Sequence, residues 1–549
     1  SFLNDIGLLP TTSCTNRNII SDNGLSGIKM AAGADNNTLQ NNHVGVDFNG
    51  SAAMGNGWHG VEITGASIQN EVGTTAGPKP VNVISGNATN GVHIGEVSTG
   101  NEVFGNHIGV NRLGWAALPN AVDGVHIRDS GGNFVGDSSG EARNVIAGNG
   151  DDGVEIQGTN SSAVAGCFVQ GNYIGVGTNG YGQIPNGDDG VLLYSNCTQN
   201  IIGGTVVGAR NLISGNYGCG VKIEHGPYGN WVYGNYIGVN RDGLGAVSNA
   251  EFGVLIVDRA NGNWIGNPTT EDTGNLISGN GANVNWGGVG LYNGADENTI
   301  CRNRIGLGAD GAVLPNMGDG IRIVNAGSNS IGGSLGASRN FISGNNGDGI
   351  QIGTNAHFNT VLNNYVGVDT NGVRARPNAG EGVFIFQSTF NTIGTNLAGN
   401  VLSGNQGSGV KISDSPQCRE NTVGGNRIGT DVAGTFRLGN SDNGVTIYGS
   451  PSNRIGGAFQ RNTISGNDKS GIQIEGAGAE GNKVFDNAIG VDDFGASVIS
   501  NGMDGVSVFD AARTSIGGAG VFGNDIGGNG RYGVLLNGLG AFGNRVQGN

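Results

Sequence analysis

The chain has 549 residues, 110 of them glycine, and carries a formal net charge of −16 from 27 basic and 43 acidic residues. This charge argues against nucleic acid and anionic membranes as partners, and it disfavours a strongly anionic polysaccharide. The sequence has no apolar run of the roughly 18 residues that a spanning helix needs, so no membrane insertion is expected.

The dominant feature is a phrase of the type G-V-x-I that recurs about every 32 residues. Its spacings mostly alternate between long and short, which indicates two kinds of coil in a super-repeat of about 63 residues. Self-similarity at this period indicates a solenoid, a propeller or an array, and a propeller needs about 40 residues per blade. The copies begin at Gly27, Gly60, Gly91, Gly124, Gly153, Gly190, Gly220, Gly253, Gly288, Gly320, Gly349, Gly382, Gly409, Gly444, Gly471, Gly505 and Gly533.

Each apolar run is short and alternates inward and outward, as in Val221-Lys222-Ile223, which is the period of a strand. Glycine and asparagine separate the runs and suit tight bends. The pattern therefore predicts an all-β fold, a single-stranded parallel β-helix of about 17 coils. Asparagines at one register should form a hydrogen-bonded ladder. We assign to it Asn42, Asn106, Asn172, Asn235, Asn303, Asn364, Asn426 and Asn487 of the long coils, and Asn87, Asn149, Asn216, Asn280, Asn345, Asn405 and Asn467 of the short coils.

Two motifs carry a resemblance to a known family. The phrase N-x-I-G-G…A-R-N-x-I-S-G-N, from Asn200 to Asn216, and G-N-Y-I-G-V, from Gly234 to Val239, resemble the right-handed parallel β-helix repeats of pectin-lyase-like proteins. They look most like the long arrays of large secreted bacterial proteins. The resemblance covers residues 1–549 and implies one continuous right-handed β-helix, located outside the cell or on its surface. Enzymes, tailspikes and adhesins all use this scaffold, so the resemblance leaves the activity open.

Both ends of the sequence read as repeat. The stretch from Arg17 to Ser21 already matches the short coil, and the last residues, Asn544 to Asn549, stop in mid-coil. We therefore expect a window from a longer array. An uncapped solenoid end exposes unpaired strand edges, which permits self-association.

The outward residues of four successive G-V-x-I phrases form the first candidate site. They are Glu62, His93, His126 and Glu155, about 4.8 Å apart from coil to coil. Imidazoles beside carboxylates could perform acid–base catalysis or bind a transition metal. Metal ligands must converge on a point, however, and a straight column spreads them along a line. The alternative is a solvated face with no function, and no metal is predicted here.

A second candidate is an apolar column at the residue before the core apolar position of N-x-I. Phe134, Phe168, Ile201, Trp231 and Trp264 occupy it in consecutive coils, and Tyr233 lies beside it. An exposed stripe of this kind usually marks a binding surface, for a glycan or for a protein partner. The alternative is that an insert folds over the stripe and buries it.

A third column follows the ladder asparagine of the long coils and includes Tyr173 and Tyr236. It recurs every second coil, roughly 10 Å apart, and could contact every second sugar of a glycan by ring stacking. The alternative is packing against neighbouring outward side chains.

The long-coil inserts, such as Gly45 to Gly50 and Gly367 to Gly372, carry Asp or Asn in a turn. These residues could line up as Ca²⁺ sites, but turn chemistry explains them without a metal. No cofactor is therefore expected.

Two functions remain open. The first is an extracellular structural or adhesive rod that binds a polysaccharide or a protein partner along its lateral face. The second is a carbohydrate-active enzyme, a polysaccharide lyase or glycoside hydrolase, with Glu62, His93, His126 and Glu155 as its catalytic residues. The paired acids Asp151-Asp152 and Asp188-Asp189 precede G-V-x-I as repeated turns, which argues against a catalytic role for them.

Overall fold

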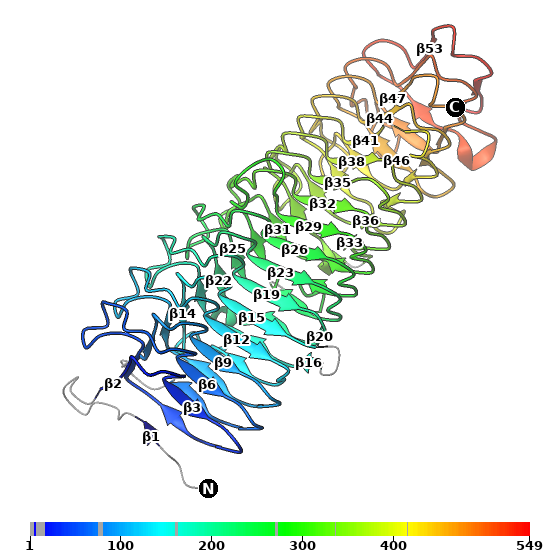
Figure 1. Cartoon of the computed structure of the whole chain (residues 1–549). Coiled ribbons are helices and arrows are strands. Elements are labelled where there is room, and N and C mark those ends of the chain that lie inside the picture. The colour runs from blue at the N-terminus through cyan, green and yellow to red at the C-terminus, as the bar shows by residue number, and fades with distance from the viewer. Residues whose placement is uncertain are drawn as a thin grey trace. The chain divides into compact units, whose positions relative to one another are not determined.

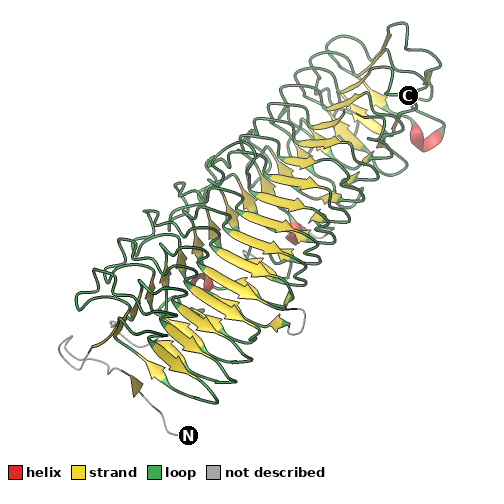
Figure 2. Ribbon diagram, viewed as in Figure 1, coloured by secondary structure: helices red, strands yellow, loops and turns green. Residues whose placement is uncertain are grey.

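A computed structural model describes residues 5–6, 17–74, 81–159, 163–269, 273–334, 336–413 and 415–549. The chain divides into two compact units, Ser1–Ala282 and Asn283–Asn549. In each unit, successive coils add one strand to each of three parallel sheets, which we name A, B and C (Figures 1 and 2). The predicted all-β parallel solenoid is confirmed. Its described helical turns are the short 3₁₀ segments η1 (Val207–Ala209), η2 (Gly336–Ser338) and η3 (Gly520–Phe522), and no helix in the described residues could cross a membrane.

Sheet C is built from the G-V-x-I phrases. In the first unit its strands are β3 (Ile28–Met30), β6 (Val61–Ile63), β9 (Val92–Ile94), β12 (Val125–Arg128), β15 (Val154–Gln157), β19 (Val191–Tyr194), β23 (Val221–Glu224) and β26 (Val254–Val257). In the second unit they are β29 (Val289–Tyr292), β32 (Ile321–Val324), β35 (Ile350–Ile352), β38 (Val383–Phe386), β41 (Val410–Ser413), β44 (Val445–Tyr448), β47 (Ile472–Glu475), β50 (Val506–Phe509) and β53 (Val534–Asn537).

Sheet A follows sheet C along each coil. In the first unit its strands are β1 (Asp5–Ile6), β4 (Thr38–Leu39), β7 (Glu71–Gly73), β10 (Glu102–Phe104), β13 (Phe134–Val135), β17 (Phe168–Val169), β21 (Ile201–Gly203), β24 (Trp231–Tyr233) and β27 (Trp264–Ile265). In the second unit they are β30 (Thr299–Ile300), β33 (Ser330–Gly332), β36 (Thr360–Leu362), β39 (Thr392–Ile393), β42 (Thr422–Val423), β45 (Arg454–Gly456), β48 (Lys483–Phe485), β51 (Ser515–Ile516) and β54 (Arg545–Val546). A small extra pair, β16 (Val164–Ala165) and β20 (Cys197–Thr198), lies in the first unit.

Sheet B completes the coil. In the first unit its strands are β2 (Asn18–Ile20), β5 (Asn42–Val44), β8 (Val83–Ile84), β11 (His107–Ile108), β14 (Val145–Ile146), β18 (Tyr173–Ile174), β22 (Leu212–Ile213), β25 (Tyr236–Ile237) and β28 (Leu276–Ile277). In the second unit they are β31 (Arg304–Ile305), β34 (Phe341–Ile342), β37 (Tyr365–Val366), β40 (Val401–Leu402), β43 (Arg427–Ile428), β46 (Asn462–Ile464), β49 (Asn487–Ile489) and β52 (Asp525–Ile526).

The interior of each coil is narrow and apolar. On β12, Val125 and Ile127 point inward and are fully buried, whereas His126 between them points outward. Gly124 precedes this strand at a point where a Cβ atom would lie 2.4 Å from Ile146 Cγ2 and 2.6 Å from the carbonyl oxygen of Gly153. Stacked backbones this close leave room only for glycine, which explains why the repeat phrase begins with it.

In the described residues, three asparagine ladders run along the coils, rather than the single one predicted. Asn42 bonds Asn82 and Asn82 bonds Asn106 in a first ladder, whereas Asn56 bonds Asn87 and Asn87 bonds Asn120 in a second. A third precedes sheet A and includes the bond from Asn200 to Asn230. The prediction that the asparagines of long and short coils share one register is therefore wrong. A short coil carries two asparagines five residues apart, such as Asn144 and Asn149, and each joins a different ladder.

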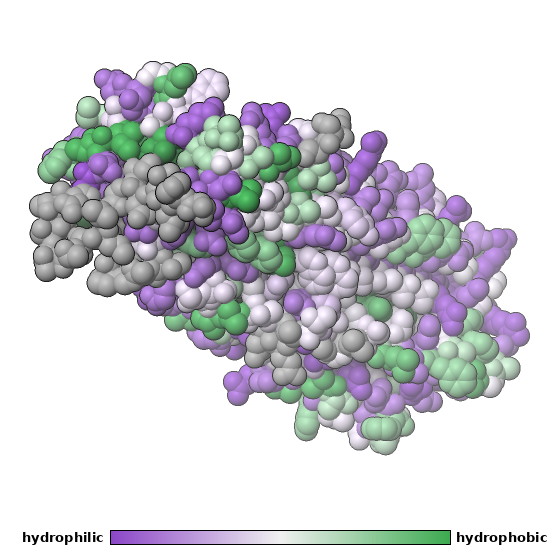
Figure 3. Space-filling view, turned by 90° about the horizontal axis from the view of Figure 1, so that it is seen from below, coloured by the Kyte–Doolittle hydropathy of each residue, from purple (hydrophilic) through white to green (hydrophobic). Residues whose placement is uncertain are grey.

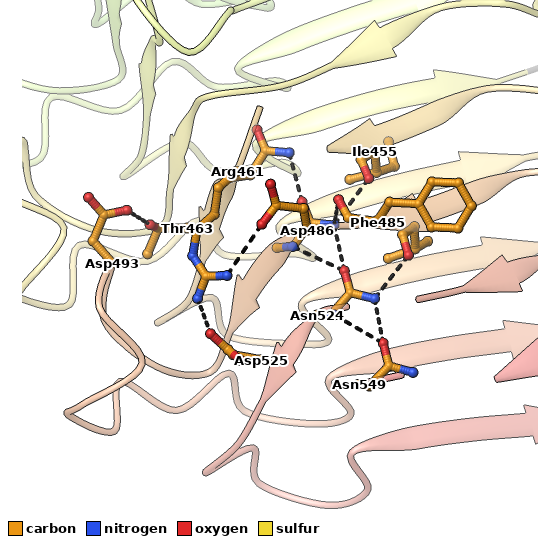
Figure 4. A network of polar contacts seen from close by, with 12 residues as sticks. Ile455, Arg461, Thr463, Phe485, Asp486, Asp493, Asn524, Asp525 and Asn549 are labelled. Atoms are coloured by element: carbon orange, nitrogen blue, oxygen red, sulfur yellow. Dashed lines mark hydrogen bonds and ion pairs between the residues drawn. The ribbon is translucent and has the colours of Figure 1, made fainter. Parts of the chain in front are cut away.

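Figure 4 shows the end of the first ladder in the second unit, where Asn524 donates to Asn549 at 2.7 Å. Arg461 reaches Asp486 and Asp525 beside it. At the corresponding position of three other short coils, Arg143, Arg210 and Arg339 each lie over a tyrosine ring instead. Ala488 occupies the place of that ring here, and the guanidinium of Arg461 pairs with carboxylates instead.

The long-coil inserts form a second layer over sheet B. Each insert closes with one antiparallel bridge, such as Val46 to Ala53 and Val110 to Ala117, once every second coil. This alternation confirms the two-coil super-repeat. Successive inserts also bond to each other, and Arg112 N donates to Gly50 O at 2.8 Å. The insert residue Gly50 packs on the ring of His43, which is fully buried. The outward face of sheet B is thus closed along these coils, which leaves sheets A and C with open faces.

The aspartates of the inserts bond to their own turns. Asp47 Oδ1 accepts the backbone N–H groups of Ser51 at 2.7 Å and Ala52 at 3.0 Å, and Asp369 Oδ1 accepts those of Val373 and Arg374. These bonds hold the pKa of Asp47 below its usual value. Turn formation therefore accounts for these aspartates, and Ca²⁺ binding by them stays a hypothesis.

Candidate functional site

The outward column of sheet C places the first candidate residues side by side. The parallel register pairs Glu62 with His93, His93 with His126, and His126 with Glu155. The four side chains therefore occupy consecutive strands, β6, β9, β12 and β15, as the repeat predicts. Lys29 on β3 precedes them, and its Nζ lies 2.6 Å from Glu62 Oε1.

A third imidazole joins this column. His59, in the turn before β6, stacks on His93 with ring centroids 4.6 Å apart and an interplanar angle of 10°. His93 in turn meets His126 edge-on at 5.2 Å, and Trp58 meets His59 edge-on at 5.5 Å. Sequence reasoning missed His59 because it considered only the outward residue of the phrase. The usable signal is the residue before the repeat glycine, which is polar at His59, Asn90, Asp123, Asp152 and Asp189.

These side chains line a groove of about 440 Å³ on the open face of sheet C. Trp58 is half exposed and offers an apolar surface, whereas Arg128 and the carboxylates of Glu96 and Asp129 offer charge and hydrogen bonds. A concave site with one aromatic side chain and several convergent polar groups is the usual form of a small-ligand site. The lining residues are Trp58, His59, His93, Gly95, Glu96, His126, Arg128 and Asp129.

The three imidazoles of the groove are neutral at neutral pH. Burial lowers the pKa of His59 to about 4 and that of His126 to about 3, and it also lowers the pKa of His93. The neighbouring imidazole of His93 lowers the pKa of both others further. The rings can therefore donate and accept hydrogen bonds without carrying charge.

Asp123 and Glu155 flank His126. His126 Nδ1 lies 3.7 Å from Asp123 Oδ2, and His126 Nε2 lies 3.5 Å from Glu155 Oε2. Asp123 is almost fully buried, and burial beside the charge of Glu155 raises its pKa to about 8. Burial raises the pKa of Glu155 as well. Two carboxyl groups and an imidazole in this arrangement could share a proton or hold a metal ion.

The buried carboxyl groups before the repeat glycine also have a structural task. Asp123 Oδ1 accepts the N–H of Asp152 at 3.2 Å, Asp152 Oδ1 accepts that of Asp189, and Asp189 Oδ1 accepts that of Cys219. This ladder holds the turns of successive coils together. Repeated turn use is what the sequence predicts for Asp152 and Asp189.

The aromatic column on sheet A has the predicted register. Phe134, Phe168, Ile201, Trp231 and Trp264 follow one another across β13, β17, β21, β24 and β27. Phe134 and Phe168 stack at 5.1 Å with an angle of 4°, and Trp231 and Trp264 stack at 4.9 Å with an angle of 7°. Tyr233 meets Trp231 edge-on at 6.3 Å. The rings are half-buried and present their faces to each other, so the column offers mainly ring edges to a partner.

The third predicted column lies under arginines and inserts. The guanidinium of Arg143 lies 4.1 Å from the centre of the Tyr173 ring, and that of Arg210 lies 4.0 Å from the centre of the Tyr236 ring. Tyr173 is buried and Tyr236 is half-buried. The geometry gives these tyrosines a packing role in the layer between sheet B and the inserts.

The second unit has its own hollow on sheet C, of about 370 Å³ over β41, β44 and β47. Lys469 Nζ lies 2.8 Å from Asp442 Oδ1 there, and Asn443 bonds Thr446 and Gln473. Its charges and amides are largely bonded to one another, in contrast to those of the first groove.

Exposed apolar side chains form separate patches among polar ones on the face seen in Figure 3.

The sequence matches no protein-family model and no curated protein. Among solved structures, the A-module of mannuronan C-5 epimerase AlgE4 from Azotobacter vinelandii is 12% identical over 82% of this chain and 88% of that chain, with a TM-score of 0.26. The surface adhesin PfbA of Streptococcus pneumoniae is 11% identical over 70% of this chain and 81% of that chain, with a TM-score of 0.28. The Dettilon tailspike protein is 15% identical over 86% of this chain and 62% of that chain, with a TM-score of 0.26. At this distance the similarities carry no argument about the activity of this chain.

Proposed function

We propose that this chain is an extracellular β-helix that binds a neutral glycan along its lateral face, in the groove of sheet C in the first unit. The observation that carries the proposal is the convergence of Trp58, three neutral imidazoles and Arg128 on one hollow. Sugars present C–H faces that pack on aromatic rings and hydroxyl groups that bond to imidazoles, guanidinium and carboxylates.

Charge favours a neutral ligand over an anionic one. Arg128 Nε lies 3.8 Å from Asp129 Oδ2, so the groove offers little free positive charge. Glu96 adds a further carboxylate to the lining, and the whole chain carries −16. An anionic polysaccharide would meet repulsion along this face.

The test is a glycan-array screen of the full chain with three variants. Trp58→Ala removes the aromatic surface of the groove and is expected to weaken binding at least tenfold, since it removes a stacking surface. Trp115→Ala is the matched control, because Trp115 is exposed on an insert and its Nε1 donates to Thr178, away from the groove. The double variant Trp231→Ala/Trp264→Ala tests the column of sheet A. Loss of binding in this double variant alone would move the site to sheet A, and no binding to any glycan would reject the proposal.

A carbohydrate-active enzyme is the second candidate function. The side-by-side placement of Glu62, His93, His126 and Glu155 favours it, because proton transfer to a glycosidic oxygen needs acidic and basic groups within reach of one bond. Product analysis of each glycan that binds separates the two functions. Turnover that is lost in His93→Ala, with binding retained, would assign catalysis to the column.

The column of sheet A stays a candidate surface for a protein partner. Its apolar ring edges suit a flat contact better than a sugar chain. Analytical ultracentrifugation of the wild type and of Trp231→Ala/Trp264→Ala tests whether that partner is a second copy of the chain.

A further inference from the structure

We infer that Asp123, His126 and Glu155 form a site for a divalent transition-metal ion of the zinc class. Each residue offers one ligand atom, and the three atoms lie within 4.8 Å of one another. The inference is independent of glycan binding, because its readout is the bound metal.

The fold explains why the ligands converge here. Glu155 follows His126 across the register of β12 and β15, as in any straight column. Asp123 comes from the turn that precedes β12, three residues before His126, and its side chain lies beside the imidazole at 3.7 Å. The turn thus supplies a ligand from outside the line of the column. The sequence alone predicts a straight column, in which the ligand atoms would not converge on one point.

Two atoms of the cluster have no hydrogen-bond partner among the residues that the structure describes. Asp123 Oδ2 and His126 Nε2 are both buried and unbonded, and the side chain of Asp123 is only 1% exposed. A buried polar atom without a partner costs about 1–3 kcal/mol. A metal ion between the three residues would satisfy Asp123 Oδ2, and it would bind His126 Nε2 once the ring proton has moved from Nε2 to Nδ1.

The charge balance also favours a cation. Asp123 and Glu155 lie beside the imidazole of His126, at 3.7 Å and 3.5 Å, and no lysine or arginine of the described residues forms an ion pair with either carboxyl group. Arg128 pairs with Asp129 instead. Two carboxyl groups therefore face each other without a fixed positive partner, and the alternatives are a shared proton or a bound cation.

The donor set selects the kind of cation. Imidazole nitrogen with two carboxylates suits Zn²⁺ and Co²⁺, whereas Ca²⁺ takes six to eight oxygen ligands. Binding through His126 Nε2 requires an acceptor for the other ring nitrogen, Nδ1. Asn90 Nδ2 lies 3.0 Å from this Nδ1, and Asn90 Oδ1 accepts the N–H of Asp123. The amide thus presents a donor where a metal-bound imidazole needs an acceptor, so Asn90 weakens ligation through Nε2, and a carboxylate at this position would favour it.

The test uses the full chain, stripped of metal with a chelator and dialysed. Zn²⁺ is titrated by calorimetry, and Co²⁺ is followed by its visible absorption. We expect one equivalent of metal ion to bind at this site. In Asp123→Asn and His126→Ala the metal affinity should fall by more than the about 10- to 100-fold that is typical of outer-shell residues. Asn90→Asp supplies an acceptor for Nδ1 and is expected to tighten binding about tenfold.

His225→Ala is the matched control. Glu224, His225 and Asp258 form another cluster with atoms within 4.8 Å, but Lys222 Nζ lies 3.2 Å from Glu224 Oε2 and supplies a cation there. We expect this variant to keep the Co²⁺ spectrum. A spectrum lost in His225→Ala but kept in His126→Ala would overturn the inference, as would Ca²⁺ binding that does not depend on His126. No binding of Zn²⁺ or Co²⁺ would also overturn it and leave a shared proton as the explanation.

Discussion

The two units use the same position of the repeat in opposite ways. In the first unit Asp123 lies three residues before the outward His126, and in the second unit Asp319 lies three residues before the outward Arg322. Arg322 Nε donates to Asp319 Oδ2 at 2.7 Å, whereas the nearest imidazole nitrogen of His126 is 3.7 Å from Asp123 Oδ2. Both aspartates are buried and both accept a backbone N–H of the next coil.

The comparison separates scaffold from site. In the second unit the guanidinium of Arg322 forms an ion pair with Asp319, so the charge of this carboxylate is balanced. The neutral imidazole in the first unit leaves two carboxyl groups without a cation, next to the groove. The identity of one outward residue therefore decides whether the repeat makes a structural ion pair or a candidate site.

Removal of the Arg322 side chain should cause the largest loss of folding stability. Arg322→Ala leaves Asp319 buried without its partner, and breaking a buried pair in this way costs about 3–5 kcal/mol. His126→Ala should cost about 1 kcal/mol, because its carboxyl neighbours can share a proton. Urea unfolding of both variants at neutral pH measures the difference. Equal losses would contradict the contrast between the units.

The pH dependence of stability should depend on Asp348. Burial and the charge of Asp319 raise the pKa of Asp348 to about 7, from about 4 in an unfolded chain. The folded state therefore holds an extra proton between these pH values. Its stabilising contribution is full below pH 4 and is lost as the pH rises to 7, at up to about 1.4 kcal/mol per pH unit.

Asp348→Asn should flatten this part of the pH profile. Unfolding free energies from pH 4 to pH 8 measure the slope, with Asp47→Asn as a control, since the pKa of Asp47 is lowered rather than raised. An unchanged slope in Asp348→Asn would mean that this carboxyl group titrates normally.

The stacked pair Trp231 and Trp264 should show a measurable coupling. A double-mutant cycle with alanine is expected to give about 0.5–1.5 kcal/mol for an aromatic pair. In the second unit Thr360 and Thr392 occupy successive places on sheet A, and the same cycle there should give a value near zero. Similar coupling at both pairs would mean that ring stacking contributes nothing to the column.

Introducing the aspartate–arginine pair of the second unit into the first unit should increase the free energy of unfolding slightly. His126→Arg places a guanidinium beside Asp123 and Glu155, and stability is expected to rise by about 1 kcal/mol or less because this side chain stays partly solvated. Zn²⁺ binding should be lost at the same time. Loss of stability in this variant would indicate that the site cannot accommodate the arginine geometry of the second unit.

Much of the fold was predictable because one phrase repeats, and each copy reports the same inward and outward pattern. The register of Glu62, His93, His126 and Glu155 followed from that repeat. The roles of His59 and Asp123 did not, since only the turn geometry shows that residues before the glycine point toward the outward column. The cover over Tyr173 was also hidden, because the sequence does not reveal where the inserts fold. The asparagine register failed for a related reason, as two asparagines flank each strand of sheet B.

The central claim, glycan binding in the first-unit groove, is tested most directly by NMR of the histidine rings. The full chain, labelled with ¹⁵N in its imidazoles, is titrated with the strongest ligand from the glycan array. Glycan binding in the groove is expected to shift the ring signals of His59, His93 and His126 and to leave those of the exposed His225 unchanged. Binding that leaves these three rings unchanged would contradict it and place the ligand on another face.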